Sequence, residues 1–332
     1  MGHSFETYVH VPGIVGIKTN FPGFRWGFGV CGSPAPEAAY EACRLKVLLD
    51  VRRDREVFSE ADPAAFTGVF RDFKAIPQGK AVLFEKKIGP VPLRFLVSVE
   101  GGRVRAVVGR SYLRLIKLKL MYIHPIAYVL FDLVSFLLLR QGMTTLYGAA
   151  ALLREGGAVF CAAAPNTGKS LTVLQLQNKY GAGILAEDMA VTDGERLWGA
   201  PYTGLYRNYH DKSLRGNGEK PETELPPQRI DAVFLLQKGA RDRVLEPEPE
   251  DLLHQLLLIN RYSLGYYYSP CLRVLDYYNR ELDVQAAQEA EARILGELAG
   301  KARRMLVERR NSLEFAPAIQ ASMAEEPPRG VS

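Results

Sequence analysis

Short runs of alternating apolar and polar positions, separated by proline and glycine, fill the first third of the chain. A two-residue period of this kind predicts β-strands, and Gly101-Gly102 between two of the runs predicts a hairpin. Residues 35–51 are expected to form a helix. Residues 1–110 are therefore predicted to be a β-rich N-terminal domain. The predicted strands are Val9–Lys18, Ala81–Lys86, Leu93–Val99 and Arg103–Val108.

An uninterrupted apolar stretch follows at Ile126–Leu139, after the basic segment Arg114–Lys119. The stretch contains Asp132 and is shorter than the roughly twenty apolar residues that a membrane-spanning helix needs. It therefore predicts a buried helix within a helical connector over residues 111–141, and a membrane role is not expected.

The pattern changes near Gly142 to strands that alternate with helices, which predicts an α/β domain over residues 142–315. Residues 201–227 are polar and rich in glycine and proline, which predicts a loop, and residues 316–332 are expected to be a disordered tail. The predicted strands are Thr145–Leu153, Ala158–Ala162, Ile184–Ala186, Met189–Thr192, Glu195–Gly199 and Ile230–Gln237, and the predicted helices are Lys169–Lys179, Pro249–Tyr262 and Asp283–Arg310.

Composition excludes several classes of protein. The 332 residues are 47% hydrophobic and 24% charged with a formal net charge of +5, which is ordinary for a globular protein. No dense Lys/Arg cluster with interleaved aromatic residues occurs, so nucleic acid is not an expected partner. The four cysteines are scattered without metal spacing, and the N-terminus does not resemble a signal peptide. These features predict a cytoplasmic protein with reduced thiols.

One segment carries a specific chemical signal. Residues 163–170 match the Walker A pattern, with alanine in place of the first glycine, and lie between an apolar strand and a predicted helix. Such a loop directs successive backbone N–H groups and a helix N-terminus at one anion. The predicted nucleotide-binding residues of this Walker A loop are Ala163, Ala164, Pro165, Asn166, Thr167, Gly168, Lys169 and Ser170, followed by Leu171.

Individual roles follow from the pattern. Lys169 is expected to reach the β- and γ-phosphates of ATP, and the Ser170 hydroxyl is expected to bind Mg²⁺. A side chain at Gly168 is expected to collide with the backbone that wraps the phosphate. Alanine at position 163 is tolerable if its φ angle is negative.

An acidic pair, Glu187-Asp188, closes the strand Ile184–Ala186, one helix and one strand after the Walker A loop. In an α/β unit this spacing brings the carboxylates to the carboxyl end of the adjacent strand, at the sheet edge that carries the loop. One carboxylate can bind Mg²⁺, assigned to Glu187, and the other can accept the proton of an attacking hydroxyl, assigned to Asp188. The alternative is that either residue merely caps a turn.

The order of these segments resembles the kinase domain of HPr kinase/phosphorylase and its bacterial relatives, which include kinases found with lasso-peptide biosynthesis. The resemblance covers roughly residues 140–240 and is carried by LYGAA (146–150), APNTGKS (164–170) and LAEDMAV (185–191). It implies a mixed-sheet P-loop domain of the HPr kinase and phosphoenolpyruvate carboxykinase type, preceded by a smaller β-rich domain.

By position, the resemblance implies phosphate and Mg²⁺ roles for Lys169 and Ser170 and a proton-accepting role for Asp188, with Glu187 as the acid before it. The family has Leu-His-Gly where this chain has Leu146-Tyr147-Gly148. Because tyrosine is not a proton shuttle at neutral pH, phosphorylase activity is not expected. HPr itself is not an expected substrate.

These features together predict an ATP- and Mg²⁺-dependent kinase that phosphorylates a Ser or Thr hydroxyl of a peptide or protein, as a possible homo-oligomer. Two alternatives remain open: a catalytically silent nucleotide-binding protein of a biosynthetic cluster, and a small-molecule kinase. A cation that closes over the γ-phosphate could come from the polar loop or from the segment after a strand. The alternative is that these residues are simply solvated. The candidates are Arg207, His210, Lys212 and Arg215 of the loop, and Arg241 after the strand.

Overall fold

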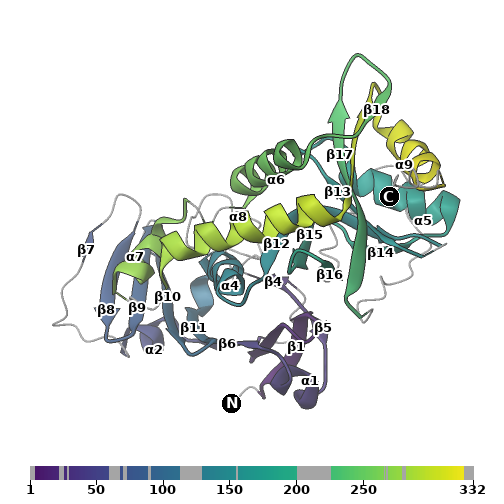
Figure 1. Ribbon diagram of the computed structural model, residues 1–332. Helices are drawn as coiled ribbons and strands as arrows, with labels where there is room; N and C mark the ends of the chain where they lie inside the picture. Colours follow the sequence, from purple (N-terminus) through teal and green to yellow (C-terminus); the bar gives the residue numbers. More distant parts are fainter. Residues whose placement is uncertain are drawn as a thin grey trace. The chain divides into compact units, whose positions relative to one another are not determined.

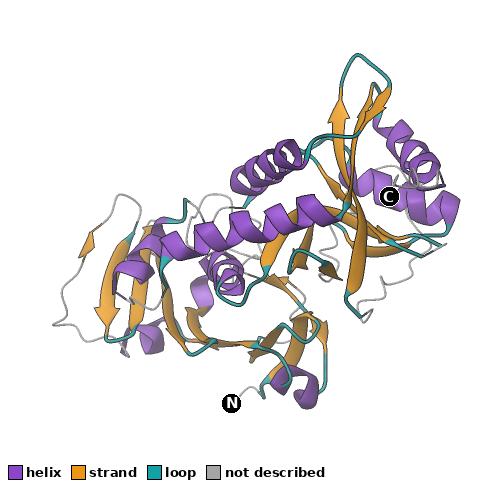
Figure 2. Cartoon of the chain, in the orientation of Figure 1, coloured by secondary structure: helices purple, strands orange, loops and turns teal. Residues whose placement is uncertain are grey.

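The computed structural model describes residues 4–21, 26–27, 30–59, 68–69, 73–88, 91–112, 129–154, 156–199, 226–264, 266, 268–278 and 282–324. The chain forms two compact units. The first contains Met1–Gln141 and Gly265–Ala290, and the second contains Gly142–Leu264 and Glu291–Ser332. Each unit has a mixed β-sheet with helices (Figures 1 and 2), so the predicted α/β class is confirmed.

The first unit is built on a sheet of nine strands among its described residues, in the order β5-β1-β2-β6-β11-β10-β9-β8-β7. β6 runs parallel to β2 and to β11, and the other pairs are antiparallel. The strands are β1 (Glu6–Val11), β2 (Val15–Thr19), β5 (Ser33–Pro34), β6 (Leu45–Arg52), β7 (Gly68–Val69), β8 (Lys74–Gln78), β9 (Ala81–Ile88), β10 (Val91–Glu100) and β11 (Arg103–Gly109); β3 (Trp26–Gly27) and β4 (Val30–Cys31) pair separately.

Two sequence predictions in this unit are wrong. The strand expected at Val9–Lys18 is interrupted by a turn, because Gly13 adopts a positive φ of 69°. The helix expected over residues 35–51 ends after five residues as α1 (Glu37–Glu41), and β6 follows. Leu45, Val47 and Leu49 are all at most 1% exposed, a two-residue alternation that a strand between two parallel neighbours buries.

The remaining helices of this unit include the apolar segment that precedes Gly142. Among the described residues they include α2 (Asp54–Ser59), α4 (Val129–Leu139) and α7 (Pro270–Tyr278). In α4 both apolar side chains and Asp132 are buried, which confirms the predicted buried helix. Among the described residues, no helix has the length and apolar character needed to cross a membrane.

The second unit contains a sheet of eight strands among its described residues. Seven strands pair in the order β13-β12-β15-β16-β17-β19-β18, and β17 also pairs with the first strand of this order, β13. The eighth strand, β14, pairs with β12. β13, β17 and β19 are parallel. The strands are β12 (Thr144–Leu152), β13 (Ala158–Ala162), β14 (Gly183–Ala186), β15 (Met189–Thr192), β16 (Arg196–Gly199), β17 (Gln228–Lys238), β18 (Arg243–Leu245) and β19 (Arg303–Arg309).

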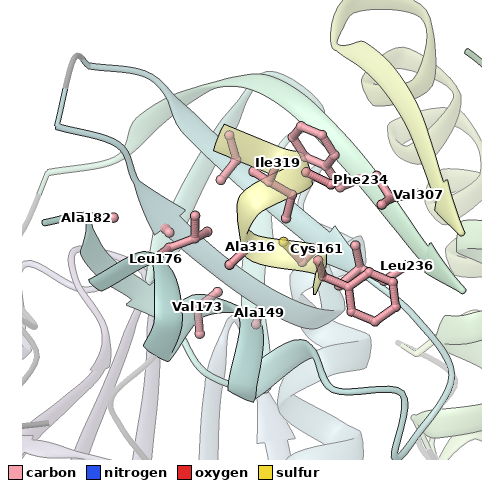
Figure 3. Close-up of a cluster of buried hydrophobic side chains, with 14 of the residues drawn as sticks. Ala149, Cys161, Val173, Leu176, Ala182, Phe234, Leu236, Val307, Ala316 and Ile319 are labelled. Carbon is pink, nitrogen blue, oxygen red and sulfur yellow. The ribbon is translucent and has the colours of Figure 1, made fainter. Parts of the chain in front are cut away.

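Helices cover both faces of this sheet. α5 (Lys169–Tyr180) and α9 (Phe315–Ala324) pack on one face, against Val159 and Cys161 of β13 and Phe234 of β17 (Figure 3). α6 (Pro249–Ser263) and α8 (Val284–Lys301) supply the residues that cover the other face, where Phe160 of β13 points. A strand buried on both faces reads as a continuous apolar run, which explains why β13 is recognisable from its sequence.

Tertiary packing overturns two predictions here. The helix expected over Asp283–Arg310 ends at Lys301, and its last part is β19, because Val307 is fully buried between β17 and β18. The tail expected to be disordered from residue 316 forms α9 up to Ala324, because Phe315 and Ile319 are buried beside α5. Residues 325–332 and most of the predicted loop 201–227 lie outside the described residues. Residues 265–290 belong to the first unit, so the predicted domain 142–315 is not continuous.

Candidate functional site

The Walker A loop connects β13 to α5, as the sequence predicted. Asn166 and Gly168 have positive φ angles of 63° and 118°, and Ala163 does not. The condition under which alanine is acceptable at position 163 is therefore met. Left-handed residues within a short turn direct neighbouring backbone N–H groups toward one side, which makes a concave site for an anion.

Hydrogen bonds within the loop converge on one carbonyl oxygen. The Ala164 carbonyl accepts from the Thr167 N–H at 3.4 Å, from the Thr167 hydroxyl at 2.8 Å and from the Lys169 ammonium at 3.3 Å. The first helical bond of α5 is from the Thr172 N–H to the Gly168 carbonyl. The N–H groups at the start of any helix have no acceptor within that helix, and at the start of α5 they are the groups that a bound anion would use.

Two more distant segments brace the loop. The Ser312 hydroxyl donates to the Thr167 carbonyl at 3.0 Å, and the Lys238 ammonium donates to the Asn166 carbonyl at 3.3 Å. A Cβ atom on Gly168 would lie 2.6 Å from Cβ of Ser312. Glycine is thus required at this position, but its closest conflict is with this serine and not with the loop backbone.

The acidic pair lies at the same sheet edge. β14 is parallel to β13 but separated from it by β12, so the expectation of a directly adjacent strand is wrong, whereas the expectation of a shared edge is confirmed. The Gly148 N–H donates to the Asp188 carbonyl at 2.9 Å, and Gly148 is opposite Ala162, the last residue of β13. Asp188 is therefore one strand away from the start of the Walker A loop.

Ser170 and Glu187 also come together. The Ser170 hydroxyl lies 3.4 Å from the Glu187 carbonyl oxygen, and the Glu187 side chain is only 4% exposed. A hydroxyl and a carboxylate are hard oxygen donors of the kind that Mg²⁺ takes together with substrate phosphates. Within the part of the chain that the structure describes, no group of three or more His, Cys, Asp or Glu residues could hold a metal ion.

Tyr147 of β12 contacts both charged groups of the site. The Lys169 ammonium lies 4.4 Å from the centre of the Tyr147 ring, within the range of a cation–π interaction. The Tyr147 side chain also hydrogen-bonds to the Asp188 carboxylate, which helps to lower the pKa of that carboxyl group. Tyr147 thus joins the lysine of the loop to the aspartate at the end of β14.

Burial and charge act in opposite directions on this pair. Burial raises the pKa of Asp188, and the Lys169 charge and the Tyr147 hydrogen bond oppose the rise. Burial lowers the pKa of Lys169, and Asp188 opposes that change. Each group therefore stabilises the charged form of the other in a partly desolvated setting.

A buried amide from α6 fixes the strand segment that carries Tyr147. The Asn260 side chain accepts from the Tyr147 N–H at 2.9 Å and donates to the Thr145 carbonyl at 3.0 Å and to the Glu291 carboxylate at 3.2 Å. β13 pairs only with residues 148–152 of β12, so Asn260 satisfies backbone groups for which β13 provides no partner.

Sequence reasoning missed four residues of this arrangement: Tyr147 as a contact, Asn260, Lys238 and Ser312. Lys238 and Ser312 come from strand ends whose register cannot be read locally. The buried Asn260 did leave a signal, because a polar residue on the apolar face of a helix is expected to be hydrogen-bonded. Arg241 lies in the turn after β17, and its backbone N–H donates to Glu308. The candidates Arg207, His210, Lys212 and Arg215 lie outside the described residues.

Comparisons with known proteins add no further assignment. No protein-family model matches the chain, and no curated protein matches it.

Proposed function

We propose that this protein is a P-loop kinase of the HPr kinase type, which transfers the γ-phosphoryl group of ATP to a Ser or Thr hydroxyl of a peptide or protein. The observation that carries the proposal is the contact of Tyr147 with both Lys169 and Asp188. A cationic phosphate ligand and a carboxylate base must lie this close if one phosphoryl group is to meet both.

The division of labour follows from the chemistry of the side chains. The loop amides and Lys169 would bind the β- and γ-phosphates, and Asp188 would accept the proton of the attacking hydroxyl. Burial raises the pKa of Asp188, which makes its carboxylate a better proton acceptor than one in water. Tyr147 would hold the carboxylate in one orientation.

The donor types, a hydroxyl and a carboxylate from neighbouring residues, suit a magnesium–nucleotide complex, although the contact between Ser170 and Glu187 is to the Glu187 backbone carbonyl. Ser170 and Glu187 would hold Mg²⁺ together with phosphate oxygens, and the ion, when bound, would neutralise charge on the transferring phosphoryl group. Catalysis would then come mainly from positioning and charge stabilisation, because phosphoryl transfer needs little covalent chemistry from the protein.

The test is a pair of lysine substitutions in the same helix. Lys169→Met should raise the Kd for Mg·ATP about 100-fold, the size of a lost charge-assisted hydrogen bond, and should abolish transfer of label from γ-labelled ATP to Ser- or Thr-containing peptides. Lys179→Met, in the last turn of α5, is the matched control and should change neither. Transfer that is indifferent to Lys169 would refute the proposal.

The two open alternatives predict different outcomes of the same assay. A nucleotide-binding protein without catalysis would lose Mg·ATP affinity in Lys169→Met and transfer no label in any form. A small-molecule kinase would label a metabolite fraction but no peptide.

A further inference from the structure

The parallel strands of the second unit give the edge that carries the Walker A loop a defined order. Asp188 follows β14, Tyr147 lies on β12, and the loop follows β13. On the other side of β13, β17 pairs with β13 so that Leu235 lies opposite Ala162. β19 pairs in turn with β17, so that Arg309 lies opposite Lys238. The order along the edge is therefore Asp188, Tyr147, Walker A loop, Lys238, Arg309.

This order of residues along the sheet edge sets which end of a bound nucleotide lies toward Asp188. In the proposed reaction the γ-phosphoryl group must lie beside Asp188, because that carboxylate accepts the proton of the attacking hydroxyl. Lys169 reaches the β- and γ-phosphates, so the α-phosphate and the nucleoside continue away from Asp188. The ends of β17 and β19 lie in that direction.

The end of β17 and the short helical turn that follows β19 both contact the loop directly. The Lys238 ammonium bonds to the Asn166 carbonyl at the turn of the loop, and the Ser312 hydroxyl bonds to the Thr167 carbonyl. Two residues 72 and 145 positions away in sequence thus fix the loop on the side opposite Asp188.

The two strand ends are also tied to each other. The Arg310 guanidinium donates to the Ala240 carbonyl at 2.9 Å, and the Arg310 N–H donates to the Asp242 carboxylate at 3.3 Å. The Gly239 N–H donates to the Arg309 carbonyl at 3.1 Å. These bonds form a preorganised platform, which lowers the entropy cost of binding a ligand against it.

The platform presents surface suited to a sugar and a base. Leu313, next to Ser312, is 45% exposed, and Lys238, Ala240 and Arg310 are exposed as well. Apolar side chains and guanidinium planes are among the groups against which nucleobases pack.

We propose that residues 238–242 and 310–313 form the nucleoside side of the site, where the ribose and base of the nucleoside triphosphate lie. This inference rests on the proposed function, because it needs a nucleotide on the Walker A loop. It assigns the segments after β17 and β19 a nucleoside-binding role, whereas the sequence indicated only Arg241 of the first segment, as a candidate cation for the γ-phosphate.

Photolabelling tests the location of the base. The full chain is irradiated with Mg²⁺ and 8-azido-ATP, digested, and mapped by mass spectrometry, with excess ATP as competitor. The expected ATP-protected label falls within residues 238–242 or 310–313. Protected label elsewhere would overturn the inference while leaving nucleotide binding intact, whereas the absence of any protected label would overturn the proposed function and the inference with it.

A second measurement separates nucleoside binding from support of the loop. Leu313→Asp should raise the Kd for Mg·ATP about tenfold, within the range found for loss of one base-packing contact, and should leave the Kd for Mg·tripolyphosphate within about twofold. Leu245→Asp is the matched control, since Leu245 is 43% exposed and lies on β18, away from the loop. If Leu313→Asp weakened the binding of Mg·ATP and of Mg·tripolyphosphate equally, the segment would only support the loop, and the inference would be overturned.

Discussion

Each unit of this protein contains an aspartate whose carboxyl group is withdrawn from water, and the two differ in their partners. Asp132 on α4 is 3% exposed, and burial raises its pKa to about 7. The Ser269 side chain hydrogen-bonds to it, and among the described residues its Oδ1 atom has no hydrogen-bond partner. Asp188 is also subject to burial, but Lys169 and Tyr147 stabilise its charged form.

The difference separates a carboxyl group suited only to packing from one suited to the proposed reaction. Asp132 lies on an apolar helix with a neutral partner, so folding favours its protonated form. Asp188 lies at a strand end beside a cation and keeps part of its surface exposed, so it can remain charged and still meet a substrate. A raised pKa alone does not identify a candidate site. A neighbouring cation and access for a substrate are needed as well.

The largest expected effect comes from removing the charge of Asp188, the proposed base. Asp188→Asn should lower kcat for phosphoryl transfer at least about 1000-fold, because general-base catalysis and orientation of the acceptor are lost together. The Kd for Mg·ATP should change less than about threefold, since Lys169 and the loop amides remain. Single-turnover kinetics and calorimetry measure the two quantities. A similar loss in both would make Asp188 a binding residue and not a base.

The second effect concerns the loop that gives Asp188 its neighbouring cation. Gly168→Ala should destabilise the protein by about 2 kcal/mol, because alanine disfavours a φ of 118° and its Cβ would meet Ser312. Affinity for Mg·ATP should fall at least about 100-fold. Urea denaturation and calorimetry provide the readouts. Gly300→Ala in α8, where nothing lies within 4 Å of the added Cβ, is the control and should be neutral or slightly stabilising.

The third prediction concerns the other aspartate, and here removal of the charge is expected to improve a property of the protein, its stability. Asp132→Asn should stabilise the protein by about 2 kcal/mol at pH 8, because it removes a carboxylate that must be buried charged. The pKa in the folded state is raised to about 7 from 3.8, so the folded state binds more protons and stability falls as pH rises from about 4 to 7. The advantage of the variant should therefore grow over that range and be constant above it.

Urea denaturation at pH 5 and pH 8 measures this effect. Glu289→Gln, at an exposed carboxylate on α8, is the control and should show no such pH dependence. A variant that is equally destabilised at both pH values would show that Asp132 is needed as a hydrogen-bonding carboxyl group.

The smallest effect tests what links Lys169 to Asp188. Tyr147→Phe keeps the ring beside Lys169 but removes the hydrogen bond that lowers the pKa of Asp188. The pKa of Asp188 should rise further, so the acidic limb of the kcat–pH profile should move to higher pH, and kcat should fall about tenfold. Tyr180→Phe, at the end of α5, should leave the profile unchanged. An unchanged profile in Tyr147→Phe would show that the hydroxyl does not act on Asp188.

Some parts of the fold could be predicted from the sequence, and others could not. β13, the Walker A loop and α5 were predicted within a residue or two, because an apolar run, a motif and a helical period follow one another directly. β6 and β19 were predicted as helices. Both are strands between neighbours that are distant in sequence, and such pairing overrides local propensity.

The sequence by itself determined the local chemistry: a loop that directs N–H groups at an anion, a lysine at the start of a helix, and a carboxylate one strand later. Only the tertiary structure decided which distant groups meet them. Asn260 reaches the strand of Tyr147 across 113 residues, and Ser312 reaches the loop across 145. Such contacts depend on the registers of several paired strands at once, and no single segment of sequence contains that information.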